Sequence, residues 1–269
     1  MERPLILLVN DDGIESPGLA ASAAALDPLG DLLIVAPSVQ QSGMGHSFPY
    51  FNDGRLFETA ISSNGQTWKA YGANASPAQA VQHGVLELAD RPLALVVSGI
   101  NFGENVSTGV TASGTVGATL EAAALGVPAL AVSLEVDPSM HYTNDTSVEF
   151  RTAIHFTRLF AQRWLTAERP TGIDVLKIDI PASATPDTPW RLTHLERNRY
   201  FIPFPPLRRR LEDEGRVGYG INAKATLDEN SDVAVVRAGL VSVTPLTIDL
   251  TARVAPDALR RVLEDGHRP

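Results

Sequence analysis

Four strongly apolar runs, three of them unbroken and the fourth interrupted by Ser133, constrain the fold of this chain more than any other sequence feature. A short unbroken apolar run predicts a strand buried on both faces, as in a parallel sheet covered by helices on both sides. The runs are residues 5–9, 32–37, 93–97 and 129–134. They predict an α/β fold with three layers, α/β/α, and a doubly wound, mostly parallel sheet with a Rossmann-like core.

Helical patterns separate these runs, as the connections between parallel strands require. Three of the patterns begin with a serine of the kind that caps helices, namely Ser16, Ser76 and Ser113. Residues 55–71 depart from this rhythm. They predict an inserted β-hairpin, because Asn-Gly at positions 64–65 suits a tight type I′ turn.

The pattern changes after the fourth strand. Thr146 and Glu149 predict a capping box in front of a long amphipathic helix. Residues 174–180 predict one more strand, and residues 233–236 and 240–250 predict a pair of strands. These strands lie outside the regular alternation of strands and helices in the first half of the chain. They therefore indicate additional structure attached to the α/β core.

The sequence contains no repeats and no low-complexity linker, so a clean domain boundary is not indicated. We expect an α/β catalytic core at residues 1–183 and a C-terminal extension at residues 184–269 that is not an independent domain. The extension combines strands, an irregular proline-containing segment at residues 200–216 and a last helix from Pro256. Three arginines at positions 208–210 fit either a solvated face or a phosphate contact.

The composition excludes several classes of protein. With 269 residues, 44% of them hydrophobic, the chain is long enough to bury a large core. The 31 acidic residues outnumber the 22 lysines and arginines, which argues against a nucleic-acid polymer or an anionic membrane as partner. Cysteine is absent, so disulfides and thiolate sites are excluded. No stretch suits a signal peptide or a membrane span, and we expect a cytoplasmic protein.

Two adjacent carboxylates follow the first strand. Asp11 and Asp12 stand at the carboxyl edge of the predicted sheet, where open α/β folds bind ligands. Neighbouring strand residues point to opposite faces, and Gly13 permits the bend that would bring both side chains to one ion. A hard divalent cation would relieve the repulsion between them. The alternative is an Asx turn or a helix cap without any ligand.

Polar loops also follow the second and third strands. The first contains Ser42 and His46, and the second contains Asn101. Each fits a ligand-binding loop at the same sheet edge or an ordinary polar connection, in which His46 is only a hydrogen-bonded loop histidine. Residues 113–115, Ser-Gly-Thr, open a helix whose N–H groups and hydroxyls suit a phosphate dianion, or they form only a cap on a closely packed helix.

Several segments, taken in order, carry a family resemblance. They are LLVNDDGI at 7–14 with Pro17-Gly18, VAP at 35–37 with QSGMGHS at 41–47, VVSGINFG at 96–103, SGTVGA at 113–118 and SVTPL at 242–246. Over nearly the whole chain they resemble the SurE family of 5′/3′-nucleotidases. The resemblance implies a SurE-like fold whose β-rich C-terminal extension serves in oligomerisation.

The resemblance implies a site for one divalent cation per subunit, Mg²⁺ or Mn²⁺. The side chains that match the family's metal-binding positions are Asp11, Asp12, Ser42 and Asn101. All four offer oxygen, the ligand that hard cations prefer. The two carboxylates would balance the charge of the ion, and the two neutral groups would complete the shell without repelling a phosphate.

The resemblance also implies roles in phosphate transfer. Asp11 or Asp12 would take the proton of the attacking water. The phosphate would be bound by Asn101, Ser113, Gly114 and Thr115. His46 would protonate the leaving group or hydrogen-bond a ligand residue.

The implied reaction is hydrolysis of nucleoside 5′- and 3′-monophosphates to nucleoside and phosphate, with exopolyphosphatase as a side activity. The substrate is a small nucleotide, and a homodimer or homotetramer formed through the C-terminal extension is expected. Two alternatives remain: a non-catalytic metal- and nucleotide-binding regulatory protein that kept the fold, and a mainly structural oligomer. Dinucleotide-dependent redox chemistry is disfavoured, because the first strand-to-helix turn lacks Gly-x-Gly-x-x-Gly.

The sequence departs from the family pattern at three places. Gln79 stands where relatives carry an aspartate, and Ala112 stands where they carry a tyrosine. Lys177 and Asp179 stand where relatives tend to carry asparagines. All three leave the implied metal ligands unchanged. The first two concern the nucleoside preference and the rate, and the third is a polar change to which the sequence assigns no effect.

Overall fold

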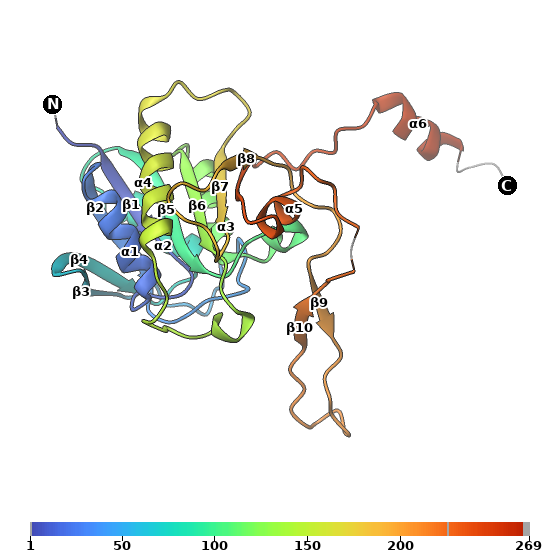
Figure 1. The fold of residues 1–269 in the computed structure, drawn as a ribbon, viewed down its shortest axis with the longest axis horizontal. Helices are drawn as coiled ribbons and strands as arrows, with labels where there is room; N and C mark the ends of the chain where they lie inside the picture. Colours follow the sequence, from blue (N-terminus) through green and yellow to red (C-terminus); the bar gives the residue numbers. More distant parts are fainter. Residues whose placement is uncertain (1, 225, 266–269) are drawn as a thin grey trace.

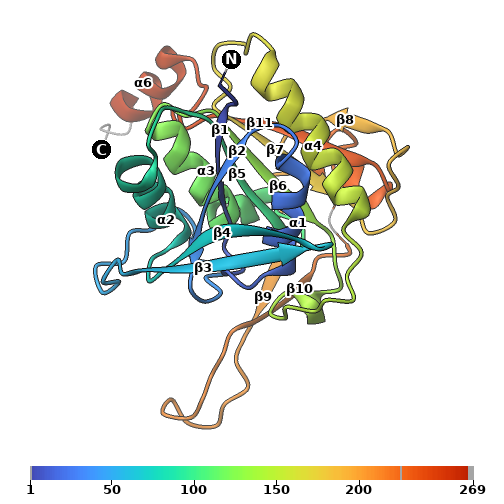
Figure 2. The same cartoon turned by 90° about the vertical axis from the view of Figure 1, so that its left-hand side faces the viewer.

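One large sheet with helices on both faces forms the body of the protein, described here from a computed structural model (Figures 1 and 2). The structure describes residues 2–224 and 226–265. Within them the main sheet has nine strands in the order β3-β4-β2-β1-β5-β6-β7-β11-β8, and β9 pairs with β10. Neighbouring strands from β4 to β7 are parallel, which confirms the predicted α/β class and the mostly parallel sheet.

The helices and strands have the following bounds. The strands of the main sheet are β1 (Leu5–Val9), β2 (Asp31–Pro37), β3 (Leu56–Ser63), β4 (Gln66–Ala73), β5 (Leu93–Phe102), β6 (Ala129–Leu134), β7 (Val175–Ile180), β8 (Trp190–Leu192) and β11 (Val241–Leu246). The small sheet consists of β9 (Phe201–Phe204) and β10 (Gly218–Ile221). The α-helices are α1 (Pro17–Leu26), α2 (Pro77–His83), α3 (Gly114–Ala124), α4 (Arg151–Thr166), α5 (Asp232–Arg237) and α6 (Pro256–Asp265).

Strand β1 shows how the core divides between the two faces of the sheet. Ile6 and Leu8 pack with residues of α1 and α4, whereas Leu7 and Val9 pack with residues of α2 and α3. All four side chains are fully buried. The two pairs of helices cover opposite faces of the sheet (Figure 2). Because alternate residues of a strand point to opposite faces, this position requires an uninterrupted apolar run.

The predicted β-hairpin is confirmed as β3 and β4. The turn between them has positive φ at both central residues, 50° at Asn64 and 81° at Gly65, as a type I′ turn requires. Strand β4 also lies parallel to β2. The hairpin therefore extends the main sheet at one edge, beside the second predicted strand.

The three serines predicted to cap helices do so. Ser16, Ser76 and Ser113 each accept a hydrogen bond from a backbone N–H in the first turn of their helix. Gln79 returns the bond, since its Oε1 accepts from the N–H of Ser76 at 3.0 Å and completes a capping box. The departure from the family pattern at Gln79 thus serves the start of α2.

The prediction of paired strands near the C-terminus is partly wrong. Residues 233–236 belong to helix α5, which Ser231 caps by accepting from the N–H of Ala234 at 3.3 Å. Val233 and Val236 pack in a cluster with Tyr200. This cap and this packing outweigh the preference of valine for strands. Of residues 240–250 only β11 is a strand, and it pairs with β7 and β8.

The predicted capping box in front of α4 is also wrong. The helix begins at Arg151, and Phe150 before it makes no side-chain cap. Glu149 lies outside the helix, where its Oε1 accepts from the N–H of Arg151 at 2.8 Å. Thr146 is therefore too far upstream to act as the cap. The predicted amphipathic character of this helix is confirmed, and its buried residues are Ala153, Phe156, Thr157, Phe160 and Ala161.

Strand β5 extends past its predicted end at residue 97. It continues to Phe102, with a shift in its register against β6 between Ser98 and Asn101. The N–H of Phe102 donates to Asp12 Oδ2 at 3.0 Å. The extended end of β5 therefore lies against the turn that follows β1.

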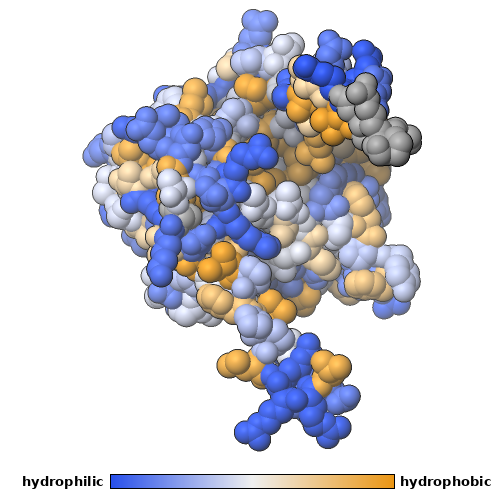
Figure 3. Space-filling view, turned by 90° about the vertical axis from the view of Figure 1, so that its right-hand side faces the viewer, coloured by the Kyte–Doolittle hydropathy of each residue, from blue (hydrophilic) through white to orange (hydrophobic). Residues whose placement is uncertain are grey.

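The C-terminal part projects from the body at two places. Strands β9 and β10 belong to an arm, residues 201–221, that extends away from the main sheet (Figure 1). Helix α6 also lies apart from the sheet, and apolar side chains stand among polar ones at both the arm tip and α6 (Figure 3). Leu207 and Leu211 at the tip are 100% and 82% exposed. In the part of the chain that is described, no helix has the length and apolar character to cross a bilayer.

Candidate functional site

A cleft of about 360 Å³ lies where β1 and β5 end and α3 begins. One part of its lining consists of residues singled out from the sequence, namely Asp11, Ser42, Asn101 and Ser113. Another part consists of residues that the sequence did not single out, among them Glu104, His141, Phe201 and Tyr219. Ala112, one of the departures from the family pattern, also lines the cleft. The fold therefore brings predicted site residues from distant segments to one place.

Asp11 and Asp12 lie in the turn after β1 and are only 4% and 3% exposed. Asp11 Oδ1 accepts a hydrogen bond from Thr115 Oγ1 at 2.6 Å, and Asp12 Oδ2 accepts one from the N–H of Phe102 at 3.0 Å. Helix α3 approaches this closely because residue 114 is glycine. A Cβ on Gly114 would lie 2.7 Å from the Asp11 Cβ. The pair is thus held in place from both α3 and β5.

The environment of the pair disfavours two negative charges. Burial raises the pKa of Asp11, although hydrogen bonds from Thr115 and from the start of α3 oppose the rise. Burial, and then the charge of Asp11, raises the pKa of Asp12 well above its usual range. No basic side chain of the described chain lowers either pKa. A cation that relieves this repulsion must therefore come from outside the chain.

Gln40 connects the predicted ligands, a role that sequence reasoning missed. Its Nε2 lies 3.3 Å from Asp12 Oδ1, 3.0 Å from Ser42 Oγ and 2.7 Å from the carbonyl oxygen of His141. It therefore fixes the loop after β2, which carries Ser42, next to the Asp12 carboxylate. No local pattern could reveal this role, because Asp12 and His141 lie 28 and 101 positions away in the sequence.

Asn101 leaves one oxygen free for the cleft. Its Nδ2 donates to the carbonyl oxygen of Gly103 at 2.7 Å, and the residue is 8% exposed. Because this bond fixes which end of the amide is nitrogen, Oδ1 is the atom that faces other partners. The side chain thus offers a neutral oxygen, as predicted for a ligand of a hard cation.

The start of α3 is directed at Asp11. The hydroxyl of Ser113 caps the helix by accepting from the N–H of Val116 at 3.1 Å, and the Thr115 hydroxyl donates to Asp11. The backbone N–H groups of Gly114 and Thr115 also hydrogen-bond to Asp11. Asp11 thus already engages the Thr115 hydroxyl and both N–H groups, whereas the Ser113 hydroxyl only accepts in its cap bond and keeps its O–H for a phosphate.

Comparison with known proteins identifies the family. The family model described as Survival protein SurE matches residues 6–201. The chain belongs to the SurE family.

Relatives in this family match nearly the whole chain. 5′-Nucleotidase SurE of Methanothrix thermoacetophila is 40% identical over 267 residues, which cover 96% of this chain and 98% of the relative. 5′-Nucleotidase SurE of Thermococcus gammatolerans is 38% identical over 261 residues, covering 96% and 95%. The crystal structure of the SurE protein from Aquifex aeolicus matches with a TM-score of 0.75 and 30% identity, covering 97% of this chain and 100% of that one. The predicted SurE-like fold is therefore confirmed.

His46 lies against α3, and it is not among the described residues that line the cleft. Its Nε2 is 2.8 Å from Glu121 Oε2, and Gln82 donates to the other oxygen of Glu121 at 2.8 Å. The loop packs closely on the helix at Gly117, where a Cβ would lie 2.2 Å from the carbonyl oxygen of Gly45. The structure does not bring His46 to the carboxylate pair, and its role as proton donor stays a prediction.

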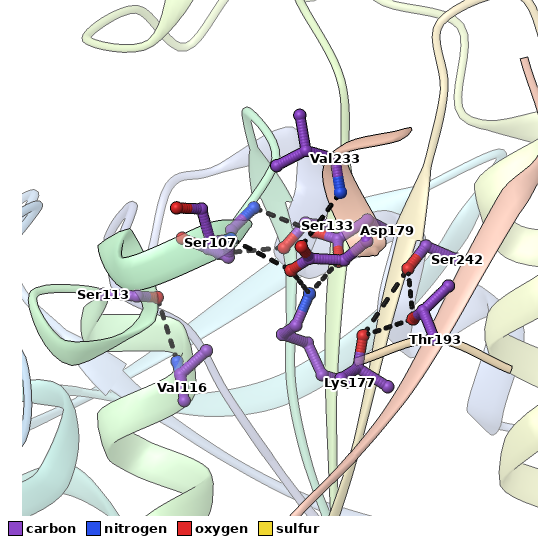
Figure 4. Close-up of polar contacts among 12 residues, drawn as sticks. Ser107, Ser113, Val116, Ser133, Lys177, Asp179, Thr193, Val233 and Ser242 are labelled. Carbon is purple, nitrogen blue, oxygen red and sulfur yellow. Dashed lines mark hydrogen bonds and ion pairs between the residues drawn. The ribbon is translucent and has the colours of Figure 1, made fainter. Parts of the chain in front are cut away.

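A second group of buried charges lies around Lys177, whose ammonium group points toward Asp179 (Figure 4). Lys177 is fully buried, and its Nζ contacts Asp179 Oδ2 and lies 3.2 Å from Asp232 Oδ2. The departure from the SurE family pattern at Lys177 and Asp179 is thus an internal ion pair. Asp179 Oδ1 accepts from the N–H of Asn105, which lines the cleft, and Asp232 Oδ2 accepts from the N–H of Ser107. The cluster therefore holds the loop after β5.

The residues at the SurE cleft fit a hard divalent cation. Asp11, Ser42 and Asn101 line the cleft, and the carboxylate of Asp12 follows Asp11 in the turn and accepts from Gln40. Together these four side chains form an all-oxygen set. Within the residues that the structure describes, no group of three or more His, Cys, Asp or Glu side chains gathers to hold a metal ion. The raised pKa values of Asp11 and Asp12 are what a bound cation would reverse.

Proposed function

We propose that this SurE-family protein is a metal-dependent phosphomonoesterase, a 5′-nucleotidase that releases phosphate from nucleoside monophosphates. The observation that carries the proposal is the buried pair Asp11 and Asp12, which lies beside neutral oxygens and the N-terminal end of α3. This arrangement combines ligands for a hard cation with the positive end of a helix dipole and the Ser113 hydroxyl for a phosphate. The names of the curated relatives, 5′-nucleotidase SurE, support the same activity.

The proposed mechanism divides the work between a cation and the chain. The residues that would hold the ion are Asp11, Asp12, Ser42 and Asn101. When bound, the cation supplies positive charge that polarises the phosphoryl group and lowers the pKa of water. The Ser113 O–H and the positive end of the α3 dipole bind the phosphate, and the Ser113 oxygen keeps this helix end in place. Asp11 or Asp12 accepts the proton of a water that attacks phosphorus in line with the leaving ribose oxygen.

A chelation assay tests the proposal. We expect the protein to hydrolyse 4-nitrophenyl phosphate and AMP in the presence of Mg²⁺ or Mn²⁺. Treatment with EDTA should reduce turnover at least about tenfold, and adding back either cation should restore it, because the all-oxygen ligand set favours hard cations. Full activity after EDTA treatment would overturn metal dependence. No phosphate release with any cation would favour the non-catalytic nucleotide-binding alternative.

We extend the proposal to nucleoside 3′-monophosphates and to the ends of polyphosphate chains. The predicted phosphate site consists of Asn101, Ser113, Gly114 and Thr115 at one helix start, which would bind a terminal phosphate without regard to the position of the ester. Phosphate release from 3′-AMP and from a short polyphosphate, measured beside release from AMP, tests this extension. Turnover restricted to 5′-monophosphates would contradict it.

We also propose a homodimer or homotetramer formed through the C-terminal extension. The arm carries Leu207 and Leu211 with 100% and 82% of their surface exposed, and α6 exposes Leu259, Val262 and Leu263 along one side. Apolar side chains on projecting segments favour burial against another subunit. A monomeric mass by light scattering at micromolar concentration would count against this proposal.

A further inference from the structure

Glu104 is a buried carboxylate in the cleft that the mechanism does not use. It is 5% exposed, it lines the cleft, and its Oε2 is buried without a hydrogen-bond partner in the structure. Burial raises the pKa of Glu104 to about 7, and a hydrogen bond from Tyr200 opposes the rise. A buried polar atom without a partner costs about 1–3 kcal/mol, so such atoms are uncommon unless a ligand completes them.

His141 presents a second buried atom without a partner in the same cleft. Its Nε2 makes no hydrogen bond, whereas its Nδ1 lies 3.1 Å from the Tyr219 hydroxyl. Burial lowers the pKa of His141, so the ring is neutral at pH 7. The ring packs closely against Gly103, where a Cβ would lie only 2.7 Å from Nε2. Oε2 of Glu104 and Nε2 of His141 are therefore two unsatisfied polar atoms in one cleft.

Flat rings surround this part of the cleft. His141 stacks on Tyr219 with ring centroids 6.4 Å apart and planes at 19°. Phe201 meets His141 edge-on at 6.1 Å and meets Tyr219 edge-on at 5.4 Å. Flat rings combined with a few buried polar atoms are typical of sites for aromatic heterocycles. Arg199 also lines the cleft and could meet a phosphate. A nucleobase, however, offers both a flat face for the rings and polar edge groups for the two buried atoms.

We propose that Glu104 and His141, together with the rings of Phe201 and Tyr219, form the nucleobase pocket of the cleft. In this pocket Glu104 Oε2 accepts a hydrogen bond from an N–H on the pairing edge of the base. This inference rests on the proposed function, since it names the part of the same cleft that would select the substrate. A carboxylate oxygen accepts a hydrogen bond from the amino group of adenine or from the N–H groups of guanine. A site built to bond such a group discriminates against a base that lacks it, because the buried oxygen is then left without a partner.

A matched pair of substrates tests the inference. AMP carries an amino group at the pairing edge, and purine riboside 5′-monophosphate has the same rings, sugar and phosphate without any N–H at that edge. At about pH 8, above the pKa of Glu104, the carboxyl group is mostly charged. We then expect wild-type kcat/KM to be at least about tenfold higher for AMP, as one hydrogen bond to a charged group of about 1.5–3 kcal/mol implies. Equal kcat/KM for the two substrates in the wild type would overturn the inference.

Three variants assign the discrimination to the carboxyl oxygen. Glu104→Met keeps a side chain of similar length without an acceptor, and the AMP preference should fall to about twofold or less. Glu104→Gln keeps a carbonyl oxygen in the same shape and should retain most of the preference, which a merely structural role would not require. Glu87→Met, at a glutamate 58% exposed and paired with His83 on the surface, is the control and should leave the ratio unchanged.

The outcome for this pocket is separable from the outcome for the proposed function. If the wild type releases no phosphate from 4-nitrophenyl phosphate or AMP, the proposed function fails. The preference for AMP over purine riboside 5′-monophosphate is then measured as the ratio of their dissociation constants by calorimetry. If Glu104→Met discriminates as strongly as the wild type in either measurement, the pocket assignment is wrong even where phosphatase activity is present.

Discussion

Two buried groups of carboxylates lie near the same cleft and differ in one respect. Asp11 and Asp12 are enclosed without any basic side chain that lowers their pKa values. Asp179 and Asp232 are equally buried, but they share the ammonium group of Lys177. The first group has a pair of negative charges that the chain leaves unbalanced, whereas the second contains its own counter-ion.

The difference separates a ligand site from a structural one. Burial raises the pKa of Asp179, and the charge of Lys177 opposes that rise. Burial favours a lower pKa for Lys177, but attraction to Asp179 and Asp232 outweighs it, so the pKa is raised and the side chain stays charged. At Asp12 the neighbouring Asp11 adds to the effect of burial. A cation from solution would therefore relieve the repulsion between Asp11 and Asp12, whereas Lys177 already balances charge at the second group.

The largest expected effect comes from removing the internal counter-ion. Lys177→Met leaves Asp179 and Asp232 buried together, and we expect the free energy of unfolding to fall by about 3–5 kcal/mol. Urea denaturation measures this loss. Lys69→Met is the matched control, because Lys69 pairs with Glu58 at 2.8 Å while 57% and 66% of these two side chains are exposed. The control should cost less than about 1 kcal/mol.

A double variant sharpens this prediction. Lys177→Met combined with Asp179→Asn removes the ion pair as a whole, and Asp232 keeps hydrogen bonds from the N–H groups of Ser107, Glu196 and Val233. The double variant should therefore be more stable than Lys177→Met alone. If Lys177→Met costs no more than the surface control, the two carboxylate groups do not differ as described.

The second-largest expected effect is a loss of phosphatase turnover when one charge is removed from the pair Asp11 and Asp12. Asp12→Asn keeps the shape of the side chain and removes one charge, so metal affinity and phosphatase activity should fall together. We expect kcat/KM to fall at least about a hundredfold, or about 2.7 kcal/mol of transition-state stabilisation. Without metal the variant should melt at or above the wild type, because the repulsion from Asp11 is gone. Near wild-type activity would remove Asp12 from the site.

The smallest effect separates the two groups by their response to added cation. At about ten times its dissociation constant, Mg²⁺ or Mn²⁺ should stabilise the wild type by about 1.4 kcal/mol, because it binds the folded state. The same addition should leave Asp12→Asn nearly unchanged and should stabilise the Lys177→Met/Asp179→Asn variant as it does the wild type. Thermal melting with and without EDTA measures all three. Equal stabilisation of wild type and Asp12→Asn would place the ion elsewhere.

Local sequence signals predicted most of the body of the fold. The apolar run at residues 5–9 specified a strand buried on both faces, and Ser16 and Ser113 marked helix starts. The position of Asp11 and Asp12 directly after a buried strand placed them at the correct edge of the sheet. Such features follow from residues close together in the sequence, which is why composition and spacing suffice to find them.

The parts that the sequence did not predict depend on distant contacts. Residues 233–236 form a helix although valine favours strands, because Ser231 caps them and Tyr200 packs on them. Gln40 became recognisable only when the fold placed it beside Asp12. Glu104 became recognisable only when the fold placed it in the same cleft as His141. The ion pair of Lys177 with Asp232 joins positions 55 residues apart. The spacing of residues along the chain does not predict such long-range contacts.

The bond from the N–H of Ser107 to Asp232 has a consequence for the order of folding. It joins positions 125 residues apart, so during synthesis the loop after β5 leaves the ribosome long before its partner does. Chains fold from the N-terminal side as they emerge, and contacts between distant positions form late. We therefore expect a nascent chain to assemble strands β1 to β6 first and to complete the cleft only after α5 has docked. Nucleotide would then meet a finished cleft only on a chain synthesised at least to residue 232.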